Sequence, residues 1–147
     1  MKKSSIFLTA VTALFIFLSI GFLQAQQKQT KSKQVIYAAA DDAKFKEVVP
    51  GVSKSVLWGN DQKGPYGAFT KFAPKVDNGM HTHTNDVWLV VLKGAYLYKD
   101  DSGEKRVKPG EFMRIPGKLK HWSGGDAKEG ALFYEESSGK FDLIPAK

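Results

Sequence analysis

Short runs of β-type residues, separated by turn residues, make up the chain from about residue 45 onward. The runs are FKEVV, VSKSVLW, YGAFTKF, GMHTH, VWLVVLKG, AYLYK, EFMRI, ALFYEE and FDLI. The breaks between them, such as GNDQKGP, APKVDNG and GGDAKEG, are rich in glycine, proline, asparagine and aspartate, which favour turns. Because the spacing is regular and this region has no long apolar pattern of helical period, the sequence predicts an all-β sandwich or barrel.

Two of these segments also indicate where their strands lie in the fold and how they pair. Residues 87–92 are apolar at every position, so we expect a central strand whose two faces are both covered. The segment LYKDDSGEKRV is typical of a hairpin, because its turn at residues 100–103 is charged and suited to solvent.

The first residues have a different pattern. Lys2 and Lys3 precede an uncharged, largely apolar stretch at residues 6–23, and the small Ala25 follows. This order is typical of a secretory signal peptide that is cleaved after Ala25, which predicts a periplasmic or secreted bacterial protein with no stable membrane insertion. An uncleaved anchor is the alternative, since the stretch is long enough to span a bilayer. The chain has no cysteine, which excludes a lipid-anchored lipoprotein and any disulfide.

Three regions follow from these patterns: a signal peptide at residues 1–25, a flexible lead-in at residues 26–44 and one domain at residues 45–147. Cleavage leaves 122 residues, enough for one compact domain. Loss of the two N-terminal lysines reduces the net charge from +7 to +5. Because basic and acidic residues are mixed in segments such as KDDSGEKRVK, we interpret the charge as a solvated surface and expect no nucleic-acid partner.

The chain has only three histidines, and two of them lie in the segment HTHTND. Side chains at positions i and i+2 of a strand point to one face, so His81 and His83 can present both imidazoles to the same point. Imidazole is a common ligand of zinc, iron, copper and nickel. The HxH pattern is weak by itself, because such a pair is more often two polar surface residues. His121 therefore decides whether the pair belongs to a site.

The segments GMHTHTNDVWLVVLKG and GEFMRIPGKLKH resemble the two signature motifs of the cupin superfamily, whose fold is a double-stranded β-helix, or jelly roll. The matching residues are His81, His83 and Gly94 in the first motif and Gly110, Pro116 and His121 in the second. The resemblance covers about residues 66–135 and implies that all three histidines occupy metal-ligand positions. It also implies one divalent transition metal as cofactor, without distinguishing Fe, Zn, Mn, Ni or Cu. The chain is similar to small exported bacterial cupins of unknown function.

Three positions depart from the cupin motifs. The glutamate ligand aligns with Val87, which cannot bind a metal, while Lys118 replaces a motif glycine and Gly125 the late asparagine. Asp86 is next to the missing glutamate, but strand alternation points it away from the histidine pair unless a bulge intervenes. We therefore expect three neutral imidazoles, a ligand set that the resemblance allows because the thiol dioxygenases of this superfamily use it. Whether Asp86 or a water replaces the glutamate stays open.

Further residues are candidates for lining a pocket near the metal. The aromatic candidates, for which core packing is the more frequent role, are Trp58, Tyr66, Trp88, Trp122 and Tyr134. Trp88 has the opposite parity to the histidines and is expected outside the barrel. The polar candidates are Arg114, Glu135 and Glu136, and alternation allows only one of the two glutamates to face inward.

Two functions are compatible with these observations. The first is a metal-dependent enzyme, dioxygenase-like or with other small-molecule chemistry, in which substrate or oxygen takes an open metal position. The second is a non-catalytic binding or sensing module in which the metal anchors a ligand or the fold. A third, purely structural alternative is a cupin without metal, whose histidines are packed polar residues. No phosphate loop or nucleophile elbow assigns a catalytic residue, and a homodimer through an outer sheet is typical of cupins.

Overall fold

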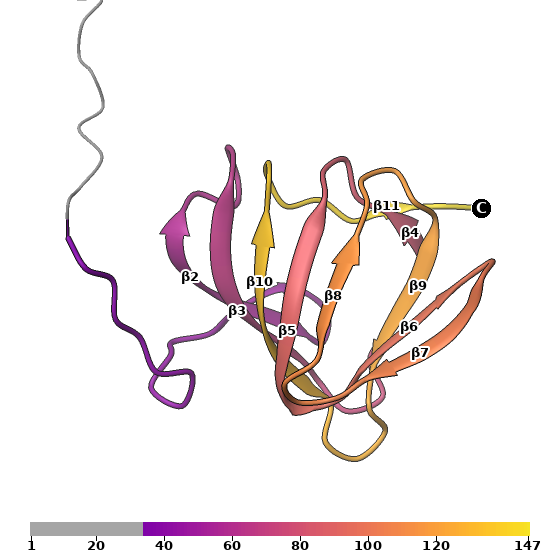
Figure 1. Cartoon of the computed structure of the whole chain (residues 1–147), viewed down its shortest axis with the longest axis horizontal. Coiled ribbons are helices and arrows are strands. Elements are labelled where there is room, and N and C mark those ends of the chain that lie inside the picture. The colour runs from indigo at the N-terminus through magenta and orange to yellow at the C-terminus, as the bar shows by residue number, and fades with distance from the viewer. Residues whose placement is uncertain (1–33) are drawn as a thin grey trace, which may run out of the picture. The chain divides into compact units, whose positions relative to one another are not determined.

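Two antiparallel sheets form the domain (Figure 1). The computed structural model describes residues 34–147, and its strands lie in the unit of residues 36–147. Sheet A contains, in spatial order, β1 (Lys46–Val49), β2 (Val52–Gly59), β3 (Tyr66–Phe72), β10 (Ala131–Ser137), β5 (Val87–Gly94) and β8 (Phe112–Ile115). Sheet B contains β11 (Ile144–Pro145), β4 (Asp77–Thr82), β9 (His121–Gly125), β6 (Tyr96–Asp100) and β7 (Gly103–Val107).

The all-β prediction is confirmed for the described part of the chain. Residues 34–147 contain no helix, and hence none long and apolar enough to cross a membrane. The predicted hairpin is β6–β7, whose pairing ends at Asp100 and Gly103. The strand β9 was not among the expected runs, because its last three residues are serine and glycine, which resemble a turn. The predicted signal peptide and residues 26–33 of the lead-in lie outside the described residues.

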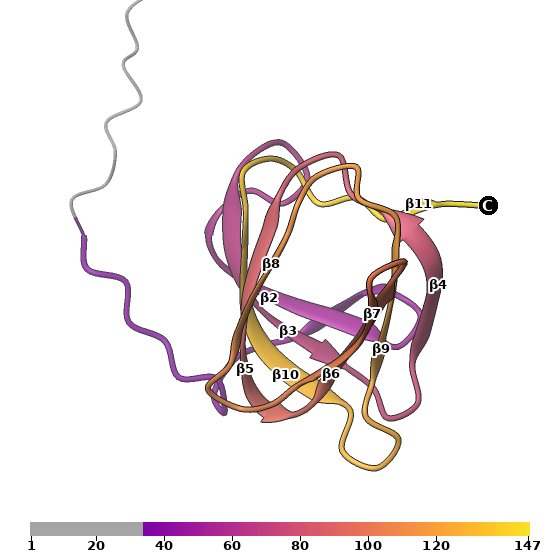
Figure 2. The ribbon, with the colours of Figure 1, turned by 45° about the vertical axis from the view of Figure 1, so that its right-hand side comes forward.

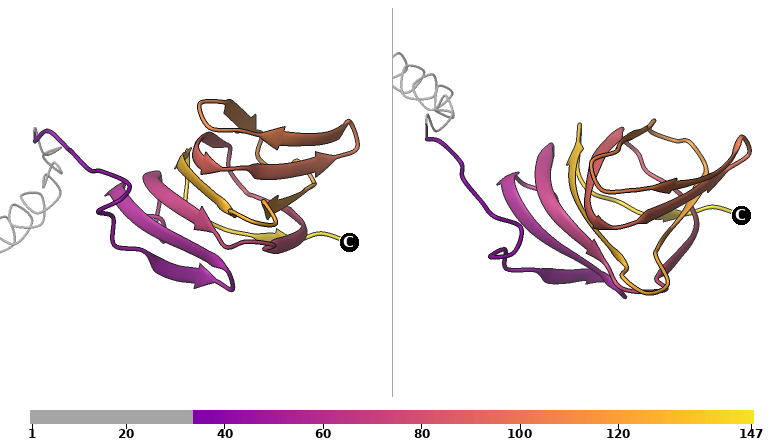
Figure 3. Two further views of the ribbon diagram at one scale, coloured as in Figure 1. Left: turned by 90° about the horizontal axis from the view of Figure 1, so that it is seen from below. Right: turned by 60° about the horizontal axis from the view of Figure 1, so that its bottom comes forward.

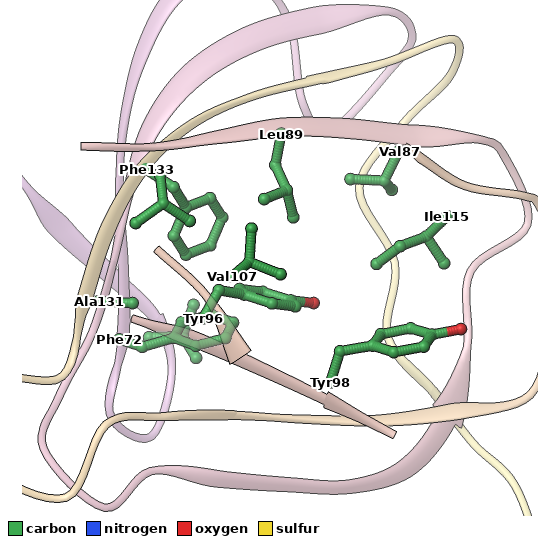
Figure 4. Close-up of a cluster of buried hydrophobic side chains, with 11 residues drawn as sticks. Phe72, Val87, Leu89, Tyr96, Tyr98, Val107, Ile115, Ala131 and Phe133 are labelled. Carbon is green, nitrogen blue, oxygen red and sulfur yellow. The ribbon is translucent and has the colours of Figure 1, made fainter. Parts of the chain in front are cut away.

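The two sheets face each other and enclose the core, as Figure 2 and Figure 3 show. Buried side chains from both sheets meet there, with Tyr96 and Tyr98 of β6 opposite Leu89 of β5 (Figure 4). The rings of Phe72 and Phe133 pack edge to face, with centroids 5.0 Å apart. Each large apolar side chain buried in this way contributes about 1.5–3 kcal/mol. The core therefore fixes the spacing of the sheets that carry the site.

The strand β5 is central, as predicted, because it pairs with β10 on one side and β8 on the other. Its inward-facing residues, including Leu89 and Val91, are buried. The prediction that both faces are covered is wrong for this chain, since Trp88 and Val90 are half-buried and Leu92 is 37% exposed. The reason is that sheet B covers only one face of sheet A.

The motif glycine at position 94 allows the chain to pass from sheet A to sheet B. Gly94 has a φ of +69°, and a Cβ there would lie 2.3 Å from the carbonyl oxygen of Gly130. A larger residue therefore meets both backbone strain and a steric clash. This turn places β6 across the interior from β5.

Candidate metal centre

The three histidines, which the sequence places far apart, converge at one point. His81 lies on β4, His83 follows that strand directly, and His121 begins β9 as the cross-strand partner of His81. The ring centroids are 4.3 Å apart for His81 and His121, 5.0 Å for His81 and His83, and 5.3 Å for His83 and His121. One nitrogen from each ring lies within 4.8 Å of the others. The predicted site residues are thus brought together.

Backbone carbonyls select the tautomer of each ring. The Nδ1 atoms of His81, His83 and His121 lie 2.9, 2.6 and 3.0 Å from the carbonyl oxygens of Gly79, Asp142 and Leu119 respectively. A carbonyl oxygen only accepts hydrogen bonds, so each neutral ring carries its proton on Nδ1 and keeps a lone pair on Nε2. A histidine that binds a metal through Nε2 needs this arrangement.

Burial keeps two of the rings neutral. His81 and His121 are 1% and 0% exposed. Burial lowers the pKa of His81 to about 4 and also lowers the pKa of His121, although a backbone carbonyl beside each ring acts in the opposite direction. The Nε2 atom of His121 is buried and has no hydrogen-bond partner among residues 34–147. Because a buried lone pair without a partner is costly, the chemistry of this donor set fits a metal ion.

No carboxylate joins the histidine group within the described residues. Val87, at the motif glutamate position, is buried in the apolar core. Asp86 accepts hydrogen bonds from Arg114 at 2.6 and 3.0 Å and from the Gly117 N–H at 2.8 Å. These bonds engage Asp86 elsewhere, so an ion at this site would have three imidazole ligands and no carboxylate to offset its charge.

The substituted motif position at Lys118 has a structural cost. Lys118 has a φ of +66°, in the left-handed region that favours glycine. Its N–H donates to the carbonyl oxygen of His83 at 2.7 Å. The neighbouring Gly117 packs so closely that a Cβ there would lie 2.7 Å from the Thr84 carbonyl oxygen. The turn at residues 116–118 thereby supports the loop after His83.

A cavity of about 30 Å³ lies between the sheets beside His81 and His83. This free space holds about two water molecules. The residues that line it are mainly apolar and come from both sheets and the C-terminal segment: Val52, Lys54, Tyr66, Thr70, Phe72, Asn78, His81, His83, Val87, Leu89, Tyr96, Ser123, Phe133, Glu135, Phe141 and Leu143. Of the five aromatic candidates, only Tyr66 lines the cavity.

A second polar group, here called the inner cluster, consists of Lys54, Tyr66 and Glu135. Lys54 is 4% exposed and forms an ion pair with Glu135. Lys54 also donates to the Tyr66 hydroxyl at 2.8 Å, and that hydroxyl donates to Glu135 at 2.8 Å. Burial, followed by the charge of Glu135, raises the pKa of Tyr66, so the hydroxyl stays protonated. The structure thus assigns the inward orientation to Glu135, while Glu136 is half-buried.

Sequence reasoning missed Lys54 as a site residue. It lies two residues after the buried Val52 on β2, so both side chains point to the same face. That parity was a signal for an inward orientation. Its partner Glu135 lies 81 residues away, and nothing local in the sequence indicates the pairing.

The last residues, 138–147, form what we call the strap, which touches both polar groups. Phe141 and Leu143 line the cavity, and the Lys54 Nζ lies 3.7 Å from the centroid of the Phe141 ring. The Asp142 side chain accepts hydrogen bonds from the Thr84 N–H at 2.9 Å and from its hydroxyl at 2.5 Å. The Asp142 carbonyl also accepts the hydrogen bond that orients His83. The strap therefore helps to hold the histidine group in place.

Comparison with known proteins agrees with this architecture. A sequence family described as the ChrR cupin-like domain matches residues 33–134. A search of curated proteins found no match. Among solved structures, the chain is similar to the polyketide cyclase RemF from Streptomyces resistomycificus, with 16% identity, a TM-score of 0.62 and coverage of 78% of this chain and 87% of that one.

Two further structures have the same fold. KdgF from Halomonas sp. is 17% identical, with a TM-score of 0.57 and coverage of 71% of this chain and 94% of that one. An RmlC-like cupin from Shewanella frigidimarina is 15% identical, with a TM-score of 0.56 and coverage of 71% and 92%. At these identities the likeness shows the fold alone, and it confirms the predicted cupin jelly roll.

Proposed function

This chain belongs to the ChrR cupin-like family, and we propose that it is an exported metal-dependent enzyme that acts on a small molecule. The observation that carries the proposal is the convergence of three imidazoles whose Nδ1 atoms all face carbonyls, which leaves three Nε2 lone pairs for one ion. Three protein ligands leave a coordination position for substrate, as catalytic sites require. The solved cupin RemF is a polyketide cyclase, so the same fold serves small-molecule chemistry elsewhere.

The chain's own residues have definable tasks in such an enzyme. A bound dication supplies Lewis acidity and lowers the pKa of a bound water. The histidines hold the ion, the three carbonyls fix their orientation, and the apolar walls, including Leu89 and Phe133, exclude bulk water. With the strap in place the cavity admits only a few heavy atoms, so a larger substrate requires displacement of Phe141 and Leu143.

A non-catalytic binding or sensing module is the second candidate, and the size of the cavity favours it. A volume of about 30 Å³ is far below the roughly 300 Å³ at which ligand pockets begin. In this alternative the ion stabilises the barrel or holds one small ligand. In that case Phe141 and Leu143 of the strap stay in place and keep the cavity closed to larger molecules.

Metal analysis of the purified protein tests the site. We expect about one equivalent of a first-row metal in the wild-type chain and a large loss in His83→Ala, since two imidazoles bind far more weakly than three. Lys120→Ala, an exposed neighbour of His121, is the control and should keep its metal. Equal metal content in wild type and His83→Ala contradicts the proposal. Metal-dependent turnover that His83→Ala abolishes distinguishes the enzyme from the module.

A further inference from the structure

The wall of the cavity on sheet A contains a polar atom that the protein leaves unsatisfied. Thr70, on β3, is 1% exposed and lines the cavity. Its Oγ1 atom is buried and finds no hydrogen-bond partner among residues 34–147. Thr70 is the cross-strand partner of Lys54 on one side and of Phe133 on the other. The unsatisfied hydroxyl therefore lies beside the inner cluster.

The charges of the inner cluster determine what this wall can bind. Lys54 and Glu135 neutralise one another, and the Lys54 ammonium group already contacts Glu135, the Tyr66 hydroxyl and the Phe141 ring. A second buried anion would have to compete with Glu135 for that single cation, at a large desolvation cost. An uncharged hydroxyl or carbonyl group has no such cost, and the Thr70 hydroxyl can donate to it or accept from it.

The histidine group, here called the histidine wall, favours a charged ligand instead. Three neutral imidazoles and no carboxylate leave a bound dication with its full charge, which favours an anionic group. Around Thr70 the sheet A side of the cavity is apolar, with Val52, Leu89 and Phe133. A complementary molecule is therefore polar at both ends, charged at only one of them, and short.

We propose that Thr70, together with the inner cluster, binds an uncharged hydroxyl or carbonyl group at the far end of a small carboxylic acid. The carboxylate end lies at the histidine group, so this part of the inference rests on the proposed function. The substrate class is thus a short-chain acid with a distal hydroxyl or oxo group. Since the cavity holds only about two water molecules while the strap is in place, such an acid enters only when Phe141 and Leu143 are displaced.

Matched acids that differ only by the distal hydroxyl test the inference. The probes are 3-hydroxypropionate and 4-hydroxybutyrate, compared with propionate and butyrate, and binding to the zinc-loaded full chain is measured by calorimetry. A buried hydrogen bond is worth about 1 kcal/mol net, so we expect roughly five-fold tighter binding of the hydroxy acid of at least one pair. Thr70→Val should remove this preference, and Thr70→Ser should retain it.

Controls separate the hydroxyl effect from a folding defect. Thr70→Val should unfold at or above the wild-type temperature, because it removes an unsatisfied polar atom. Thr82 lies between His81 and His83 in the sequence, so its side chain points to the opposite face of the strand. Thr82→Val should therefore leave the preference unchanged. Retention of the full preference in Thr70→Val overturns the inference, as does the absence of any preference in wild type.

The zinc content of the same samples distinguishes the two proposals. A wild-type chain that binds neither zinc nor another first-row metal contradicts the proposed function. A chain that binds zinc but binds no acid, or binds both acids of each pair equally, contradicts the substrate class alone.

Discussion

The two inner walls of the barrel carry buried polar groups in contrasting ways. On sheet B the imidazoles are neutral and each uses a backbone carbonyl for one nitrogen, which leaves Nε2 for an external partner. On sheet A the inner cluster contains opposite charges that satisfy one another internally. The histidines therefore keep nitrogen lone pairs that a ligand can take, whereas the inner cluster depends on its own members for its stability.

The largest effect on stability is expected from breaking the inner cluster. Lys54→Met leaves the Glu135 carboxylate buried without a counter-ion, which should cost about 3–5 kcal/mol in the free energy of unfolding. Urea denaturation measures the loss. The double variant Lys54→Met/Glu135→Leu should recover most of it, because no lone charge remains.

Lys99→Met provides the matched control for this variant. Lys99 pairs with Glu104 on the exposed hairpin β6–β7, and exposed pairs contribute little to stability because water screens them. Similar losses for Lys54→Met and Lys99→Met would refute the view that burial makes the inner cluster critical.

Acid should destabilise the metal-free chain through the histidine wall. The folded-state pKa of His81 is about 4, below the unfolded value of about 6.5, so the unfolded chain binds more protons between these values. The contribution of His81 is then fully present above pH 6.5 and is lost as the pH falls toward 4, by about 1–3 kcal/mol. Urea unfolding at pH 7, 6 and 5 with a chelator measures the slope. In His81→Asn the slope should be shallower, and an identical slope would argue against this assignment.

The strap should contribute to the affinity of the histidine wall for metal. Asp142→Ala removes both side-chain hydrogen bonds to Thr84 and loosens the carbonyl that orients His83. Loss of such an outer contact typically weakens metal binding ten-fold or more, and competition with a chromophoric chelator measures it. Asp101→Ala, in the exposed hairpin turn, should bind zinc as wild type does. Unchanged affinity in Asp142→Ala would assign the strap no part in the site.

The smallest effect concerns the turn that supports the histidine wall. Lys118→Gly relieves the strain of the left-handed conformation at this position. The free energy of unfolding should rise by up to about 1 kcal/mol, because the greater entropy of the unfolded glycine chain offsets part of this gain. Thermal unfolding compares it with Lys120→Gly, which lacks a positive φ and should be destabilised. A loss of stability in both variants would show that the strain at Lys118 is negligible.

The contrast between the walls also explains how far the sequence alone could predict them. Alternation within one strand places His81 and His83 on one face, and the motif spacing adds His121, so the histidine group could be anticipated. The strand β9 could not, because Ser123, Gly124 and Gly125 have no apolar alternation.

The inner cluster depends on sheet order rather than on local pattern. Lys54 meets Glu135 because β2 and β10 both flank β3, and neither strand sequence specifies that neighbour. The role of Asp142 was equally hidden, since its carbonyl is a backbone group that any residue could supply. What the sequence could not reveal is therefore contact between distant segments.

The position of the strap has a consequence for divergence among related barrels. The family match ends at residue 134, whereas the carbonyl that orients His83 and the Phe141 and Leu143 side chains that narrow the cavity come from residues 138–147. Substitution or lengthening of this tail can retune ion affinity and the size of an admitted molecule while the shared scaffold stays intact. We therefore expect proteins with the same barrel and the same histidines to differ in selectivity where they differ in the segment equivalent to residues 138–147.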